Sequence, residues 1–223
     1  MLTLHHLENS RSQRVLWLLE ELQLPYEIKR YARDPNRMLA PVELRKVHPL
    51  GKSPVITDGE LTLAESGAIL EYLVERYGEG RLAPAANTAD QLRYRYWMHY
   101  AEGSAMPPLL LRLVFNRISN GPMPFFIRPV ARAIAKGANQ AFIGPQLKLH
   151  LDYMESELDK SQWFAGKDFS VADIQMSFPL EAAQSRGGLD ERYPNLTAFL
   201  QRIRERPAYQ RAIEKGGPVM PGR

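Results

Sequence analysis

The sequence predicts an α/β domain followed by an all-α domain. In residues 1–80, short apolar runs alternate with helical patterns. From Ala89 onward, every convincing apolar pattern has helical spacing. The segment between them, RLAPAANT at 81–88, has the composition of a linker. We therefore expect one domain over residues 1–80 and a helical domain over 89–223.

The elements of the first domain follow the order β-α-β-(α)-β-β-α, which is that of a thioredoxin-like domain. Asp58-Gly59 is a strong signal for a two-residue hairpin, so the last two strands are expected to be antiparallel. The predicted strands are 2–6, 26–31, 55–57 and 61–63, and the predicted helices are 10–22, 42–47 and 65–77. In the second domain, helices are predicted over about 89–116, 126–160, 171–183 and 195–205, with a short one after Pro207.

Composition and charge exclude several classes of protein. The chain has no cysteine, which excludes disulfides, thiolate metal sites and cysteine nucleophiles, and we expect no metal site. It has no run of 18 apolar residues and no signal-peptide pattern, so we expect a cytoplasmic protein with no membrane partner. The net charge of +4 divides into −2 over residues 1–80 and +6 over 81–223. Because the basic residues are scattered along helical repeats without a nucleic-acid motif, we expect no nucleic-acid partner.

Polar side chains lie where the first strand meets the first helix, at Asn9, Ser10 and Ser12. Backbone N–H groups are unpaired there and the helix dipole is positive, so this junction favours an anion such as a thiolate. A thiol has a pKa of about 8.5, and one hydrogen bond plus the dipole lowers it by on the order of one to two units. Plain helix capping is the commoner use of the same serines.

The segment HPLGKSPVI, residues 48–56, suits an extended peptide ligand. Pro54 precedes a predicted strand, and a cis bond there would present Ser53 outward for strand-like pairing. Lys52 could meet a ligand carboxylate. The alternative interpretation of this segment is an ordinary turn that contains a proline.

Glu65-Ser66 begins the third predicted helix. Ser66 offers a hydroxyl and a helix N-terminal amide to a carboxylate, while Glu65 offers an anion to an ammonium group, so the pair suits an amino-acid head group. A capping box of Thr62 with Glu65 is the structural alternative.

The three features together describe a receptor for a γ-glutamyl-cysteinyl-glycine tripeptide. They occur in order at the loop ends of one small sheet. The chain resembles the cytosolic glutathione S-transferase superfamily over nearly its whole length. The similar segments are SRSQRVLWLLEEL (10–22), HPLGKSPVI, LTLAESGAILEYLVERY (61–77) and FSVADI (169–174). The last resembles the family's capping box, with Ser170 as the N-cap and Asp173 as its partner.

The resemblance is closest to the serine-type members of bacteria and fungi, and it implies residue roles. Ser10 would be the catalytic residue that activates the sulfur of glutathione, the co-substrate. Asn9 could occupy that position instead, because the family's catalytic serine shifts by one residue between classes and an amide donates the same hydrogen bond. The implied glutathione-binding residues are Lys52 for the glycine carboxylate, Ser53 beside a cis Pro54 for the cysteinyl backbone, and Glu65 with Ser66 for the γ-glutamyl end.

The resemblance also implies an activity and partners. We expect a homodimeric enzyme that conjugates glutathione to small hydrophobic electrophiles, and glutathione-dependent peroxidase activity is a second expectation. The alternative is a non-catalytic member that binds glutathione, hydrophobic ligands or other proteins. Glu102 is a candidate for reaching the glutathione of a partner subunit. Candidates for the electrophile pocket are Tyr96, Trp97, Tyr100, Met106 and Leu110.

Overall fold

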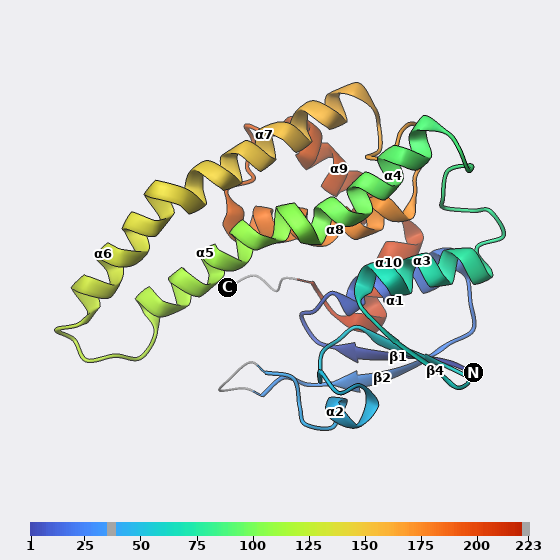
Figure 1. The fold of residues 1–223 in the computed structure, drawn as a ribbon, viewed down its shortest axis with the longest axis horizontal. Coiled ribbons are helices and arrows are strands. Elements are labelled where there is room, and N and C mark those ends of the chain that lie inside the picture. The colour runs from blue at the N-terminus through green and yellow to red at the C-terminus, as the bar shows by residue number, and fades with distance from the viewer. Residues whose placement is uncertain (35–38, 220–223) are drawn as a thin grey trace.

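The structure, a computed structural model, describes residues 1–34 and 39–219. Its four-stranded sheet has the order β2-β1-β3-β4, in which β1 pairs parallel with β2 and antiparallel with β3. The β3–β4 pair is antiparallel, as predicted. This mixed sheet, followed by helices alone, confirms the predicted fold class (Figure 1). The strands are β1 (Leu2–Leu7), β2 (Glu27–Tyr31), β3 (Val55–Asp58) and β4 (Leu61–Ala64).

The β3–β4 hairpin turns one residue later than predicted. Asp58 pairs with Leu61, so the loop is Gly59-Glu60 and not Asp58-Gly59. Gly59 has a φ of +60°, a conformation that glycine adopts without steric cost at the first position of such a turn. The Asp58 carboxylate instead accepts hydrogen bonds from Tyr72 and Tyr77, which tie the hairpin to the following helix.

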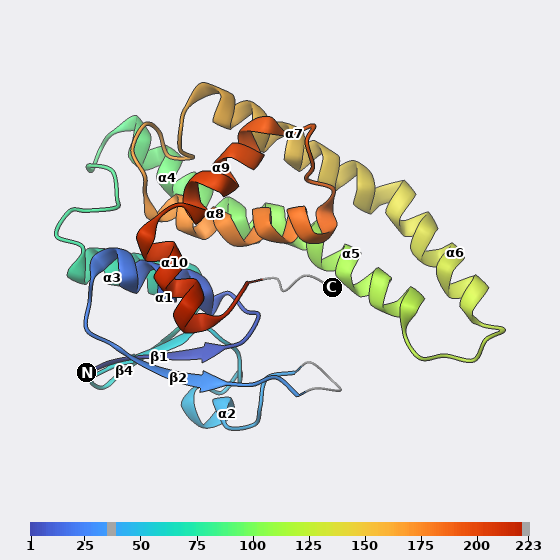
Figure 2. The same ribbon diagram turned by 180° about the vertical axis from the view of Figure 1, so that it is seen from behind.

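Helices cover both faces of the sheet (Figure 2). On one face, α1 (Ser12–Leu22) and α3 (Ser66–Tyr77) pack on the inward side chains of β1, which include Leu4. On the other face, α2 (Leu44–Val47) packs its Leu44 against Leu7. The last helix, α10 (Pro207–Gly216), packs along α1, although the two helices come from opposite ends of the chain.

The helical half contains less regular helices than predicted. The π-helical turn η1 (Ala101–Ala105) separates α4 from α5, and η2 (Asn139–Ile143) separates α6 from α7, so the predicted helices 89–116 and 126–160 each change register midway. Such turns occur frequently at functional sites. A third, η3 (Ala183–Gly187), extends α8. The α-helices are α4 (Ala89–Tyr100), α5 (Met106–Asn120), α6 (Arg128–Ala138), α7 (Gly144–Lys160), α8 (Val171–Ala182) and α9 (Pro194–Arg204).

Helix α8 forms the centre of the helical half, and each of its residues is buried. It begins with the predicted capping box, which the structure confirms. The backbone N–H of Ser170 donates to the Asp173 carboxylate at 2.9 Å, and so does the N–H of Phe164. Despite these donors, complete burial raises the pKa of Asp173 to about 7.

Candidate active site

The three predicted segments converge at the end of β1. The Ser53 hydroxyl donates to the carbonyl of His5 at 2.9 Å and accepts from the N–H of Leu7 at 3.3 Å, so the proline turn is tied to β1. On the other side, Arg14 of α1 donates to the Ser66 hydroxyl at 3.4 Å, which ties the strand–helix junction to the start of α3. The Ser53–Pro54 peptide is cis, which confirms that prediction.

Three of the predicted binding side chains are exposed around this convergence, namely those of Asn9, Lys52 and Glu65. None of them forms a hydrogen bond or ion pair with another described residue. Asn9 and Glu65 have φ values of 51° and 72°, which non-glycine residues rarely adopt. Backbone strain of this kind tends to persist where function requires it. Glu65 is itself the residue before α3 and its side chain caps nothing, so the alternative capping box with Thr62 is not formed.

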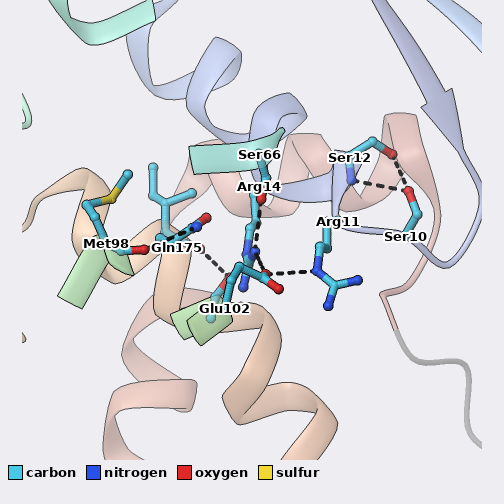
Figure 3. A network of polar contacts seen from close by, with 10 residues as sticks. Ser10, Arg11, Ser12, Arg14, Ser66, Met98, Glu102 and Gln175 are labelled. Atoms are coloured by element: carbon cyan, nitrogen blue, oxygen red, sulfur yellow. Dashed lines mark hydrogen bonds and ion pairs between the residues drawn. The ribbon is translucent and has the colours of Figure 1, made fainter. Parts of the chain in front are cut away.

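Ser10 is buried, and its hydroxyl lies in a chain of hydrogen bonds. Its Oγ accepts from the N–H of Ser12 at 3.2 Å and lies 2.8 Å from the Ser12 hydroxyl (Figure 3). The Ser12 hydroxyl lies 2.9 Å from Nδ1 of His6, and Nε2 of His6 donates to the carbonyl of Gly216 at 2.9 Å. The chain therefore runs from the junction through β1 to the end of α10.

The direction of each proton in this chain follows from His6. Burial holds the pKa of His6 below its ordinary value, so the ring is neutral at neutral pH. Because Nε2 faces a carbonyl, it carries the proton, and Nδ1 accepts from Ser12 at 2.9 Å, a shorter contact than the 3.3 Å from the Ser12 hydroxyl to the carbonyl of Leu7. The Ser12 oxygen then accepts from Ser10. The Ser10 hydroxyl therefore donates its proton to the buried Ser12 hydroxyl and not toward the exposed side chain of Asn9.

Two arginines of this junction share one carboxylate. Arg14, almost completely buried, lies 2.5 Å from Glu102 Oε1, and Arg11 lies 2.8 Å from the same oxygen (Figure 3). Both guanidinium groups also lie about 5 Å from the ring of Phe178, at 5.1 and 5.2 Å. Burial lowers the pKa of Arg14 to about 10, so it stays charged at neutral pH. Burial alone would raise the pKa of Glu102, but Arg14 and Arg11 hold it below its ordinary value.

Neither arginine is predicted as a functional residue from the sequence, and Glu102 is expected there to reach the glutathione of a partner subunit. Glu102, in η1, engages arginines of its own chain through Oε1, and this contact joins the helical half to the junction. The partners are 88 and 91 residues apart in the sequence, so no local pattern links them. The one available signal was the charge of Arg14 inside a strongly apolar helix, because a buried arginine requires an anionic partner.

Most of the aromatic candidates for the electrophile pocket belong to the core. Trp97 packs against Phe164 and Tyr153 at ring-centroid distances of 4.6 and 5.6 Å, and Tyr100 is buried beside it. Met106 is also a core residue, whereas Tyr96 and Leu110 are exposed. Trp97, Tyr100 and Met106 thus form part of the core, and the helical spacing that suggested a pocket is the spacing of the buried faces of α4 and α5.

Known proteins are similar to this chain in sequence and in fold. Residues 1–75 match the family model for the glutathione S-transferase N-terminal domain, and 123–207 match that for the C-terminal domain. Glutathione S-transferase 3 of Schizosaccharomyces pombe is 40% identical over 96% of this chain and 88% of its own length. The chain belongs to the glutathione S-transferase family. It is an enzyme of that family, with glutathione as co-substrate, as the resemblance implied.

Solved structures of other glutathione S-transferases have the same fold as this chain. A glutathione S-transferase from Actinobacillus pleuropneumoniae is 35% identical, with a TM-score of 0.76 over 98% of this chain and 94% of its own. A sphingomonad glutathione S-transferase solved with glutathione is 25% identical, with a TM-score of 0.73 over 96% of this chain and 98% of its own. Both likenesses extend through the two halves of the molecule.

Proposed function

We propose that this transferase binds glutathione where β1, the Ser53–Pro54 turn and the start of α3 meet, and that it joins the glutathione sulfur to small hydrophobic electrophiles. The convergence of these segments carries the proposal. Ser53 is tied to β1 and Ser66 to α1, so the two ends of the site have a fixed separation. A pre-organised site of this kind loses little entropy when an extended tripeptide binds.

Each end of glutathione has a complementary partner in this proposal. The exposed ammonium of Lys52 pairs with the glycine carboxylate, and the exposed carboxylate of Glu65 pairs with the γ-glutamyl ammonium. Ser66, at the first turn of α3, offers its N–H to the γ-glutamyl carboxylate. The Ser53 hydroxyl is already engaged with β1, so its backbone is the part that pairs with the cysteinyl residue, beside Pro54.

The glutathione sulfur then lies beside Asn9 and Ser10. The geometry favours the side-chain amide of Asn9 as the hydrogen-bond donor to the sulfur. The Asn9 amide is exposed and unengaged, whereas the Ser10 hydroxyl donates to Ser12. In this arrangement Ser10 holds the start of α1, the structural role that serine often has there. This refines the expectation that Ser10 is the catalytic residue.

The electrophile pocket lies between the glutathione sulfur and α5. Leu110 and Val114 are exposed apolar side chains on one face of α5, and Arg117 continues that face. Burial and the nearby charge of Arg117 lower the pKa of Arg33, which donates to the backbone carbonyl of Asn9. Because Arg117 lies close enough to Arg33 to affect its pKa, the face of α5 that Arg117 shares with Leu110 and Val114 is the one we propose to face the glutathione sulfur.

The test is calorimetric titration of the chain with glutathione, together with a conjugation assay on an aryl halide. We expect Asn9→Ala to raise the pKa of bound glutathione, measured from the ultraviolet absorbance of the thiolate, and Ser10→Ala to change it little. The opposite result would restore Ser10 as the donor. Absence of binding at about millimolar glutathione would refute the proposed site.

The same thiolate could reduce organic hydroperoxides, so a peroxidase assay accompanies the conjugation assay. We further propose a glutathione-binding domain over 1–80, a connector over 81–88, a helical domain over 89–223, and a cytoplasmic homodimer as is typical of the family. Glutathione binding without turnover of any electrophile or hydroperoxide would favour the alternative of a non-catalytic binding protein.

A further inference from the structure

Helices α5 and α6 form a hairpin that projects away from the rest of the molecule (Figures 1 and 2). Its tip carries three consecutive apolar residues, Phe125, Phe126 and Ile127, whose exposed fractions are 79%, 65% and 43%. Val130 and Ile134, each 59% exposed, continue this surface along α6 at helical spacing. We call these five residues the apolar tip. A contiguous exposed apolar surface usually marks a site of interaction with a protein or a membrane.

The hairpin also holds most of the excess positive charge of the second half of the chain. Residues 106–138, which span the hairpin, contain five Lys and Arg residues and no Asp or Glu, while the rest of residues 81–223 contains 14 basic and 13 acidic residues. Five of the six net positive charges that looked scattered in the sequence are therefore concentrated in one projecting element. A surface that approaches the hairpin meets only positive charge on it.

Three of these cations lie on α6 itself. Arg128, Arg132 and Lys136 are exposed, recur every fourth residue, and form no ion pair within residues 1–34 and 39–219. Ala131 and Ala135 of the same helix are buried. Helix α6 thus has three different sides. One carries small buried residues, one carries exposed apolar residues, and one carries the three cations that form no ion pair with a described residue.

We propose that this hairpin docks on an anionic lipid bilayer, with the apolar tip inserted at the interface and the α6 cations among the headgroups. A bilayer offers an apolar layer beneath a layer of negative charge, which complements the apolar side and the cationic side of the hairpin. Contact between two copies of the hairpin would instead oppose positive charge to positive charge. A nucleic acid would satisfy Arg128 and Arg132 but would leave Val130 and Ile134 in water.

The docking is peripheral. Among the described helices, none combines the length and the apolar character needed to cross a bilayer. The expectation of no membrane partner considered only spanning segments, so it did not address a basic hairpin of this kind. The proposed docking uses neither the glutathione site nor the α5 face with Leu110, and it stands independently of the proposed conjugation reaction.

The experiment is co-sedimentation of the full chain with vesicles of phosphatidylcholine, alone or mixed with phosphatidylglycerol. We expect binding to the mixed vesicles only, and weaker binding at high salt. The double variant Phe125→Ala/Phe126→Ala should bind at least about tenfold more weakly, because insertion of the aromatic rings is lost. Arg128→Gln/Arg132→Gln should also bind more weakly and should lose most of the salt dependence.

Matched control variants distinguish the effect of the apolar tip and the α6 cations on vesicle binding from the effect of any exposed substitution. Leu92→Ala and Arg95→Gln change an exposed apolar residue and an exposed cation on α4, and both should bind as the parent does. Thermal unfolding shows whether each variant is folded. Absence of parent binding to mixed vesicles, or unchanged binding of the Phe125/Phe126 variant, would overturn the proposal. So would a dimer that depends on Phe125 without vesicle binding, or duplex DNA binding that depends on Arg128 and Arg132 but not on the phenylalanines.

Discussion

Arg14 Nη1 lies 2.5 Å from Glu102 Oε1, across the junction between the sheet-bearing half and the helical half. The Arg14 side chain is only 1% exposed, whereas that of Glu102 is 34% exposed. Arg14 also reaches the Ser66 hydroxyl, so one buried cation connects α1, η1 and the start of α3. The charge of Arg14 is stable in this place only while the carboxylate opposes it.

Removing the carboxylate should therefore destabilise the protein. We expect Glu102→Ala to lower the free energy of unfolding by about 2 kcal/mol, less than for a fully buried pair because water reaches Glu102. Urea denaturation at neutral pH measures the change. Asp190→Asn is the control, because Asp190 pairs with Arg192 at an exposed site and its loss should leave the stability unchanged. Equal stability of Glu102→Ala and the parent would show that Arg14 does not depend on this partner.

The Ser12 hydroxyl should also be structural rather than catalytic. Ser12→Ala leaves Nδ1 of buried His6 without a donor and the Ser10 hydroxyl without its acceptor. We expect a loss of about 1–3 kcal/mol in the free energy of unfolding, the cost of unsatisfied buried polar groups.

The matched control for Ser12→Ala is Ser156→Ala. Ser156 is exposed and its hydroxyl bonds only to the carbonyl of Tyr153, so we expect a change within about 0.5 kcal/mol. If both variants were equally stable, the hydrogen-bond chain from Ser10 to Gly216 would have no energetic importance.

Local patterns were sufficient to predict the strands and helices around the site, but long-range contacts decide its chemistry. The alternation in residues 2–6 and the helical spacing in 66–77 predict their elements because both signals lie within a few residues. The π-helical turns were missed because one extra residue barely alters apolar spacing. The direction of the Ser10 proton depends on His6 and on Gly216, which is 210 residues from His6, and no local pattern contains that relationship.

A substitution of Glu65 tests the proposed binding of the γ-glutamyl end of glutathione. We expect Glu65→Ala to weaken glutathione binding by about 10- to 100-fold, because a charge-assisted hydrogen bond to the ammonium group is lost. Calorimetric titration measures the dissociation constant. Glu60→Ala is a suitable control, since Glu60 is an exposed carboxylate of the same charge in the β3–β4 loop, beyond the ends of both strands. Normal affinity in Glu65→Ala would place the ammonium elsewhere.

The buried carboxyl group of Asp173 should make the folded protein less stable as the pH rises. A carboxylate in a surface ion pair has the opposite effect. The pKa of Asp173 is about 7 in the folded protein, because of burial, against an ordinary value of 3.8. The folded state therefore retains a proton that the unfolded state releases. The stability that this group contributes is fully present below about pH 4 and is lost as pH rises to about 7, at a rate of about 1.4 kcal/mol per pH unit.

Asp173→Asn removes this titration and keeps the shape of the side chain. We expect the variant to be less stable than the parent at acidic pH, since an amide group would face the N–H donors of Phe164 and Ser170. The difference should narrow between about pH 4 and about pH 7, because the unfolded parent releases a proton that the folded parent retains, whereas the variant has no such proton. Urea denaturation across this range measures the difference, and the other carboxyl groups cancel because both proteins contain them. A difference that widened with pH would mean that the three hydrogen bonds from Phe164 and Ser170 outweigh burial and that Asp173 is ionised in the folded protein.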